Sequence, residues 1–314
     1  MDVGTKLFYI AVDLILPLMA GYACRCLGKP GDPFFRRMIE ANLFVIFPLL
    51  AVLTFWVLPW SFSLLWLPVA GVLKGVIPGL AAYWQAPAKF LSPVDQGSYI
   101  TSALMSNSTT LGGLCAFIIY GEAGYAYMQM VTMGHNAFMF GFGFPLAQYY
   151  YQKSRQEGLI RPPLIDIILH RNQLPVVGMV VGGALHAAGI SRPEAVGAIV
   201  SPLVHISAWT ALLPIGHSID FSGMRQYYRA TVDLCVIKFF LTPLAVYLLA
   251  CLVIHDRTVL NTILILAMTP TAINAVVAVK INNLNVDLAM AAFVLTTAVF
   301  VGILFPLVLL VISG

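Results

Sequence analysis

The chain has 314 residues, of which 60% are hydrophobic and 10% are charged, and its formal net charge is +4. Soluble domains carry roughly 25% charged residues. This composition, with a mean hydropathy of +0.89, therefore excludes an ordinary soluble domain and indicates a membrane protein surrounded by lipid. The small positive charge is spread over the loops between apolar segments, so no nucleic-acid partner is expected.

A membrane-spanning helix needs about 20 predominantly apolar residues. Ten segments of this kind follow one another along the chain, at about 8–27, 39–58, 65–84, 99–120, 124–148, 172–190, 194–217, 230–254, 258–281 and 286–312. No stretch between them is long enough for a soluble domain. We therefore predict an all-α membrane protein with ten transmembrane helices.

Basic residues fall unequally on the two sides of such a ten-span protein. Twelve would face one side: Arg25, Lys29, Arg36, Arg37, Lys89, Lys153, Arg155, Arg161, Arg171, Arg225, Arg229 and Lys280. Three would face the other: Lys6, Arg192 and Arg257. By the positive-inside rule the first side is cytoplasmic. This predicts a multi-pass protein of the cell (cytoplasmic or inner) membrane with both termini on the extracytoplasmic side.

Two spans are interrupted by small polar residues, at 106–110 (Ser-Asn-Ser-Thr-Thr) and at 269–274 (Thr-Pro-Thr-Ala-Ile-Asn). A broken helix inside lipid leaves backbone polar groups unpaired, which is tolerated only where they are buried in protein or line a cavity. One interrupted span in each half of a chain is the sequence feature that best indicates a transporter's binding site.

The two halves also match each other at a spacing of 158–167 residues. Residues that recur in order are Pro17 and Pro175, Pro48 and Pro214, Lys74 and Lys238, Asn107 and Asn274, and Pro145 and Pro306. Five spans per half is an odd number, so the second repeat would enter the membrane inverted. We predict repeats at 1–152 and 172–314, a short cytoplasmic linker at 153–171, and broken helices 4 and 9 crossing at the midplane, with half-helix N-termini that favour an anion.

Several motifs resemble the auxin efflux carrier family, whose members include bacterial malonate-type carriers and the plant PIN proteins. They are Pro17-x-x-x-Gly21-Tyr22, Phe47-Pro48-Leu49-Leu50, Asn107-Ser108-x-x-x-Gly112 before Tyr120-Gly121, and Pro270-x-Ala272-x-Asn274-x-x-x-Ala278 before Asp287. The resemblance covers nearly the whole chain. It departs from the plant carriers at Ser106, where they place a proline, at Ala70, where they tend to have an aspartate, and in its short central loop.

This resemblance implies a scaffold of spans 1, 2, 6 and 7 and a transport domain of spans 3–5 and 8–10. It further implies elevator-type alternating access, a homodimer formed through the scaffold, and a small organic carboxylate as cargo. His135 and Asn136 lie near the position where the family places a polar substrate contact. The more distant bile-acid sodium symporters share the architecture.

Asn107 and Asn274 are the strongest candidates for substrate contact, because each offers a donor and an acceptor at a helix break. Alternatively, they only cap the half-helices. Neighbouring hydroxyls either contact the ligand or satisfy freed carbonyls: Ser106, Ser108, Thr109, Thr269 and Thr271. Pro270 would create the second break. His135 would either change its charge near neutral pH or pack as a hydrogen-bonded core residue.

Charged residues inside spans are functional candidates by default. We expect Lys74 and Lys238 to support the crossover or offset an anionic substrate, although Lys238 would alternatively extend to the cytoplasm or pair with Asp233. Asp13 would either reach the outer interface or carry a proton. Glu122 is expected to be solvated, and His205 and His217 to serve in packing.

Five cysteines form no CxxC motif, and no Cys/His cluster has metal-ligand spacing. We expect no metal, no cofactor and no enzyme activity, since HExxH and intramembrane protease motifs are missing. Few acidic residues near the breaks favour H⁺ over Na⁺ as a coupling ion, and leave Na⁺ open. The leading function is a secondary carrier of small organic anions. The alternatives are a sodium-coupled organic-acid symporter or a channel or receptor on the same fold.

Overall fold

A computed structural model describes residues 3–155 and 174–313. The regular secondary structure of these residues is helical, apart from one isolated antiparallel bridge between two residues. The expectation of an all-α protein is therefore confirmed. Six helices among the described residues are long and apolar enough to cross a membrane: Gly4–Leu27, Asp32–Trp56, Phe62–Lys89, Glu194–Ser218, Asp233–Cys251 and Val286–Val311. Most of the predicted linker 153–171, from residue 156 on, lies outside the described residues.

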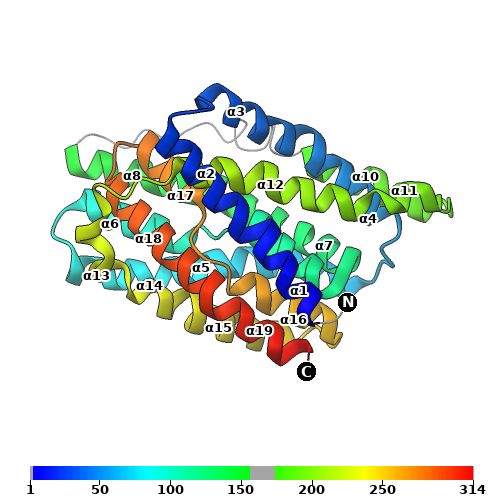
Figure 1. Ribbon diagram of the computed structural model, residues 1–314. Helices are drawn as coiled ribbons and strands as arrows, with labels where there is room; N and C mark the ends of the chain where they lie inside the picture. Colours follow the sequence, from blue (N-terminus) through cyan, green and yellow to red (C-terminus); the bar gives the residue numbers. More distant parts are fainter. Residues whose placement is uncertain (1–2, 156–173, 314) are drawn as a thin grey trace.

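One group of helices is built on two close pairs (Figure 1). It contains α1 (Val3–Ile10), α2 (Leu16–Leu27), α3 (Asp32–Ala41), α4 (Phe47–Trp56), α10 (Leu174–Ala187), α11 (Glu194–Ala198) and α12 (Val200–Ser218). α2 packs along α12, and α4 packs along α10. Short π-helical turns, Ala11–Ile15 and Asn42–Ile46, join α1 to α2 and α3 to α4 into longer rods. We call these helices the first helix group.

The α2–α12 pair depends on two glycines that face each other's backbone. A Cβ atom at Gly21 would lie 2.0 Å from the carbonyl oxygen of Leu213, and one at Gly216 would lie 2.1 Å from that of Leu18. Neither position has room for a side chain. Small residues at such contacts let membrane helices approach closely and gain van der Waals packing.

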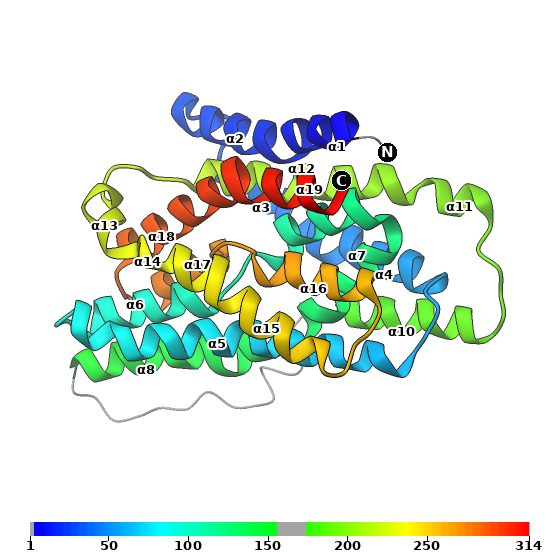
Figure 2. The same cartoon turned by 90° about the horizontal axis from the view of Figure 1, so that it is seen from below.

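The remaining helices form a second helix group (Figure 2). Its larger members are α5 (Trp66–Lys89), α6 (Pro93–Leu104), α7 (Gly113–Phe138), α8 (Phe144–Arg155), α15 (Thr242–Cys251), α16 (Arg257–Ala267), α17 (Ile273–Ile281), α18 (Val286–Val299) and α19 (Phe305–Ser313). The short helices α13 (Tyr228–Thr231) and α14 (Asp233–Val236) lead into it. α5 packs on α6, α7 and α15, and α18 packs on α6 and α17.

α7 contains a sharp turn and connects the two groups. Gly121 has φ 62° and ψ −146°, a conformation that side chains disfavour, so the helix restarts in a new direction at Glu122. Beyond this turn α7 packs on α5 of its own group, and it also packs on α4 and α12 of the first group. The turn lies where the sequence places the boundary between the fourth and fifth spans.

Both predicted helix interruptions are present. α6 ends at Leu104, and helical structure resumes only at Ser108, in a π-helical turn (Ser108–Gly112) that continues into α7. α16 ends at Ala267, and α17 begins at Ile273. The predicted spans at 99–120 and 258–281 are therefore each split into shorter helices. In Figures 1 and 2, α6, α8 and α13 gather at one end of the bundle and α11 lies at the other.

Candidate functional site

The two interrupted segments meet and hydrogen-bond to each other. Ser106 and Thr271 form the antiparallel bridge. The N–H of Asn107 donates to the carbonyl of Pro270 at 2.8 Å, and the N–H of Ala272 donates to the carbonyl of Met105 at 3.0 Å. Backbone groups freed by each break are thus satisfied by the other break, which is what burial away from water requires.

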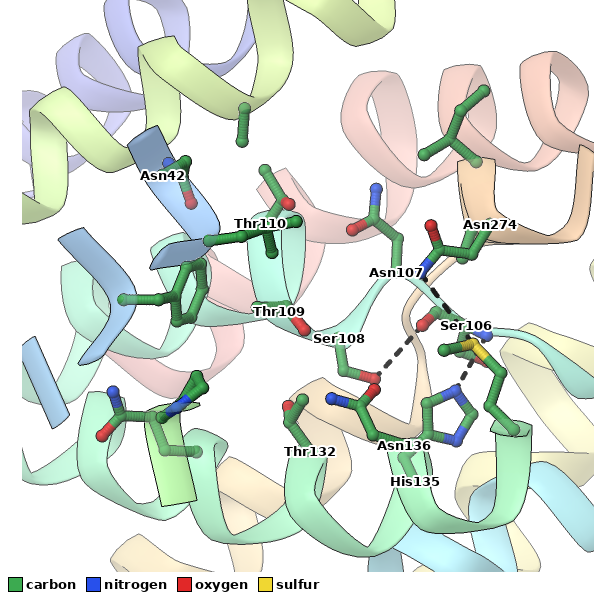
Figure 3. A pocket seen from close by; sticks show the side chains of 18 of the residues that line it. Asn42, Ser106, Asn107, Ser108, Thr109, Thr110, Thr132, His135, Asn136 and Asn274 are labelled. Carbon is green, nitrogen blue, oxygen red and sulfur yellow. Dashed lines mark hydrogen bonds between the residues drawn. The ribbon is translucent and has the colours of Figure 1, made fainter. Parts of the chain in front are cut away.

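A cavity of about 390 Å³ lies beside this bridge (Figure 3). One wall is formed by residues 106–110 and 272–274 of the two bridged breaks, which we call the crossover, and by α7 with the turn after it. The opposite wall comes from the first helix group, with Phe47 on α4, Met179 on α10 and Ile215 on α12. Among the described residues that line the cavity there is no lysine, arginine, aspartate or glutamate. The polar groups available to a ligand are therefore amides, hydroxyls and one imidazole.

Some of the candidate residues at the two breaks line the cavity, and others do not. Asn107, Ser108, Thr109, Asn274 and Ser106 line the cavity. The residues of the second break that precede Ala272 do not. The hydroxyl of Thr271 donates to the carbonyl of Ser102 at 3.0 Å, and its N–H donates to Thr296 Oγ1 at 3.1 Å. Thr271, predicted as a substrate contact, therefore lies outside the cavity lining, because its side chain bonds α6 and its backbone bonds α18.

Two helical segments begin at the cavity, one after Asn107 and one after Ala272. In the part of the chain that the structure describes, no side chain caps either start. The Asn107 side chain is buried, and its Nδ2 lacks a hydrogen-bond partner among the described residues. Asn274 is exposed to the cavity, and its Nδ2 lies 3.9 Å from Met139 Sδ. Capping therefore does not account for Asn107, and both amides remain available to a ligand.

Both intramembrane lysines lie directly behind the bridge, each about 1% exposed. Lys74 Nζ donates to Ser108 Oγ, and to Thr269 Oγ1 at 3.1 Å. Lys238 Nζ donates to Ser106 Oγ at 3.0 Å and to the carbonyl of Met105 at 3.2 Å. The two cations therefore support the crossover from behind, one hydroxyl away from the cavity.

The alternative positions weighed for Lys238 are wrong. It neither extends to the bundle end nor pairs with Asp233. That carboxylate instead contacts Lys89 Nζ at 2.6 Å and the Tyr99 hydroxyl at 2.6 Å. Among the described residues, no carboxylate forms an ion pair with either buried lysine.

His135 and Asn136 also line the cavity, on α7. The Nε2 atom of His135 accepts a hydrogen bond from the N–H of Ser106 at 3.2 Å, so the imidazole fixes the backbone at the first break. Asn136 is half-buried and lies beside Ser108 in Figure 3. The two residues have different places in the site: His135 positions the crossover, and Asn136 offers an amide to the cavity.

Two further polar residues on the same face of α7 were not predicted from the sequence. Gln129 and Thr132 line the cavity, and they precede Asn136 by seven and four residues. The amide oxygen of Gln129 lies 3.0 Å from the hydroxyl of Thr54, and its Nε2 is buried without a partner among the described residues. A helical spacing of polar residues, 129, 132 and 136, in an otherwise apolar span was the available signal.

Asp13 lies apart from the cavity, buried within the first helix group. It is 3% exposed. Its carboxylate contacts His205 Nδ1 at 2.6 Å and accepts from Trp209 Nε1 at 3.3 Å. His205 is therefore more than a packing residue, because it pairs with this buried acid. His217 stacks on Phe35 with ring centroids 4.0 Å apart, as expected of packing.

No protein-family model matches the chain, and no curated protein matches it. Among the described residues, no group of three or more His, Cys, Asp or Glu side chains is arranged to hold a metal ion.

Proposed function

We propose that the protein is a secondary transporter of small organic carboxylates that binds its cargo in the crossover cavity. The observation that carries this proposal is the pair of uncapped helix starts that meet at one cavity, with two buried lysines immediately behind them. Helix N-termini present unpaired N–H groups and partial positive charge. An anion is the ligand that complements both features.

The lining supports an anion further. Donors from Asn107, Asn274 and Asn136 face the cavity, and the described lining residues include no carboxylate that would repel one. The lysine charges act through Ser106 and Ser108, whose hydroxyls they contact. A carboxylate held at this wall would gain attraction from both cations without displacing their hydrogen bonds.

Movement across the membrane is supported by the broken helices and by the repeated sequence pattern. In our proposal, spans 1–5 and 6–10 are inverted repeats, the first helix group is the scaffold and the second is the transport domain. The cavity lies between these groups, where an elevator motion would carry the crossover past the scaffold. The resemblance to the auxin efflux carrier family supports the same assignment, together with a homodimer formed by the scaffold and H⁺ or Na⁺ as coupling ion.

The orientation follows from charge. The cavity is lined by the first turns of α10 and the last turns of α12, at the end of the bundle where the loops carry most basic residues. By the positive-inside rule, we assign this end to the cytoplasm. The conformation described is then open to the cytoplasm, with both termini outside.

Thermal stabilisation of the purified protein tests the binding step. A panel of malonate, malate, other dicarboxylates and indole-3-acetate would be titrated with and without Na⁺ at two pH values. A ligand that binds only the folded state raises the melting temperature with its concentration. We expect a carboxylate to do so in the wild type, and Asn107→Ala and Asn274→Ala to lose the shift.

Asn282→Ala is the matched control, because Asn282 follows α17 and donates to Ala278 rather than to the cavity. This variant should keep the wild-type shift. Failure of every carboxylate to stabilise the wild type, or equal shifts in all four proteins, would contradict binding at the crossover. A ligand-induced shift without uptake in vesicles would favour a receptor on the same fold.

A further inference from the structure

A bidentate ion pair joins the two helix groups at the α11 end of the bundle. Arg192, in the loop before α11, donates through Nη1 and Nη2 to the carboxylate of Glu122 at 2.7 and 3.1 Å. Nη1 also donates to the carbonyl of Leu53 on α4 at 2.8 Å. The Arg192 side chain is 11% exposed and that of Glu122 is 31% exposed. Glu122, which was expected to be solvated, is partly exposed and also forms this ion pair.

Glu122 begins a stripe of residues on one face of α7 that contacts the first helix group. Tyr125 and Gln129 follow at spacings of three and four, which places all three on the same side of the helix. Tyr125 stacks on Phe47 of α4, with ring centroids 6.3 Å apart, and Gln129 contacts Thr54 of α4 at 3.0 Å. This stretch of α7 thus contacts α4 directly at Tyr125 and Gln129, and indirectly at Glu122 through Arg192.

Further along α7, the same face of the helix lines the cavity instead of packing on α4. Thr132 and Asn136, the next residues at these spacings, line the cavity. Tyr125 is only 2% exposed, whereas Ile39, which lines the cavity where α3 ends, is 42% exposed. The interface between the helix groups is therefore closely packed toward the α11 end, whereas the cavity reaches an exposed residue of α3 on the other side.

We propose that the Glu122–Arg192 ion pair is a latch that holds the α11 end closed while the cavity is open at the opposite end. This inference rests on the proposed function, because transport requires a second state in which the α11 end opens. Opening would separate Glu122 on α7 from Arg192 and from the Leu53 carbonyl on α4. The latch thus sets how often the second state forms.

Its contribution follows from its geometry. A bidentate Arg–carboxylate pair is a strong, directional contact, and separating it here leaves two partly buried charges. Removing either partner should raise the population of the open α11 end by about tenfold, because charged hydrogen bonds of this kind correspond to such a ratio.

Hydrogen–deuterium exchange of the detergent-solubilised protein measures this population without any substrate. Residues 44–56 and 117–129 contain the sealed contacts. We expect Glu122→Gln and Arg192→Gln each to speed exchange in both segments by about tenfold. The double variant should resemble either single variant, since the pair is already broken in each.

Asp220→Asn is the matched control. It breaks the Arg25–Asp220 ion pair of 2.6 Å, which lies within the first helix group at the other end. Exchange in the two segments should stay at the wild-type rate. A second protein, with Glu122→Cys and Arg192→Cys, allows the end to be closed covalently by a short bifunctional thiol reagent. Exchange should be slow when the reagent bridges the cysteines and fast when it does not.

Unchanged exchange in both single variants, additive effects in the double variant, or equal exchange in the bridged and unbridged protein would each overturn the latch. If the single variants fail to fold, the bridged and unbridged comparison decides alone. The result is also separable from the proposed function. A protein that binds no carboxylate can still show the latch, and a carboxylate transporter can lack it.

Discussion

Replacing Lys238 with methionine should separate ligand affinity from protein stability. The ammonium lies 3.0 Å from Ser106 Oγ, and that hydroxyl lines the cavity. A carboxylate oxygen that accepts a hydrogen bond from the same hydroxyl would lie about 2.7 Å from Ser106 Oγ on its other side. The two charges would then be roughly 6 Å apart, which corresponds to about 3 kcal/mol at an effective dielectric constant of about 20. Loss of this attraction should weaken carboxylate binding by about a hundredfold.

The same substitution should not weaken the ligand-free protein in parallel. Methionine leaves the Ser106 hydroxyl without one partner, but it also removes the cost of burying a charge that no described carboxylate pairs. The Met105 carbonyl that Lys238 contacts keeps its hydrogen bond from Ala272 at 3.0 Å. We therefore expect an equal or higher melting temperature without ligand, together with a much smaller ligand-induced shift.

Titration of the melting temperature against carboxylate concentration measures both quantities in one experiment. Lys280→Met is the control, because Lys280 is an exposed residue near the end of α17 and its charge is screened by solvent. It should bind like the wild type. Wild-type affinity for the carboxylate in Lys238→Met would show that the lysine charge does not attract the ligand. The same would follow if the substitution weakened binding of a neutral carboxamide analogue as much as binding of the acid.

Three further predictions concern the stability of the ligand-free protein. Gly71→Ala should lower the melting temperature, because the added Cβ atom would lie 1.9 Å from the Val131 carbonyl oxygen on α7. Gly141→Ala is the control and should leave the melting temperature unchanged, because no atom lies within 4 Å of the added Cβ. Asp13→Ala should cost about 1–3 kcal/mol in the free energy of unfolding by denaturant, since its histidine and tryptophan partners lose their acceptor; wild-type stability would contradict the burial of this acid. Hydrogen bonds from the Ser222 hydroxyl and N–H hold the pKa of Asp220 below its usual value, so the stability it adds is present above the ordinary aspartate pKa and is lost as pH falls through the lowered one. The difference in melting temperature between wild type and Asp220→Asn should therefore be small, because this loop is exposed, and should vanish in acid; a difference that grows in acid would reverse the sign of this reasoning.

The features that the sequence could reveal are those with a local physical cause. Polar residues and a proline interrupt apolar spans at 106–110 and 269–274, and helices break there because each such residue favours a non-helical backbone or a cap. Lysines within apolar segments can also be recognised in the sequence. Because a buried charge needs polar partners, such lysines are expected to contact polar groups of the protein. Their approximate role behind the crossover followed from their matching positions at 74 and 238.

The features that the sequence could not reveal depend on contacts between distant segments. Thr271 and Asn274 are equally polar and lie in the same break, yet one points into the packing and the other into the cavity. Periodicity does not decide this, because a broken segment has no fixed repeat. The pairing of Asp13 with His205 joins residues 192 apart in the chain, and it depends on how the π-helical turn Ala11–Ile15 packs against α12.

Uptake into proteoliposomes tests directly whether the protein carries a carboxylate across a membrane from the cavity at the two breaks. Vesicles preloaded with an unlabelled carboxylate, chosen by its thermal shift, would be diluted into a trace of the same acid carrying a radiolabel. The account predicts saturable exchange of label in the wild type and in Asn282→Ala, and its loss in Asn107→Ala and Asn274→Ala. Exchange that persists in both cavity variants would contradict the crossover site. A wild-type protein that binds the acid without exchanging it would contradict transport itself.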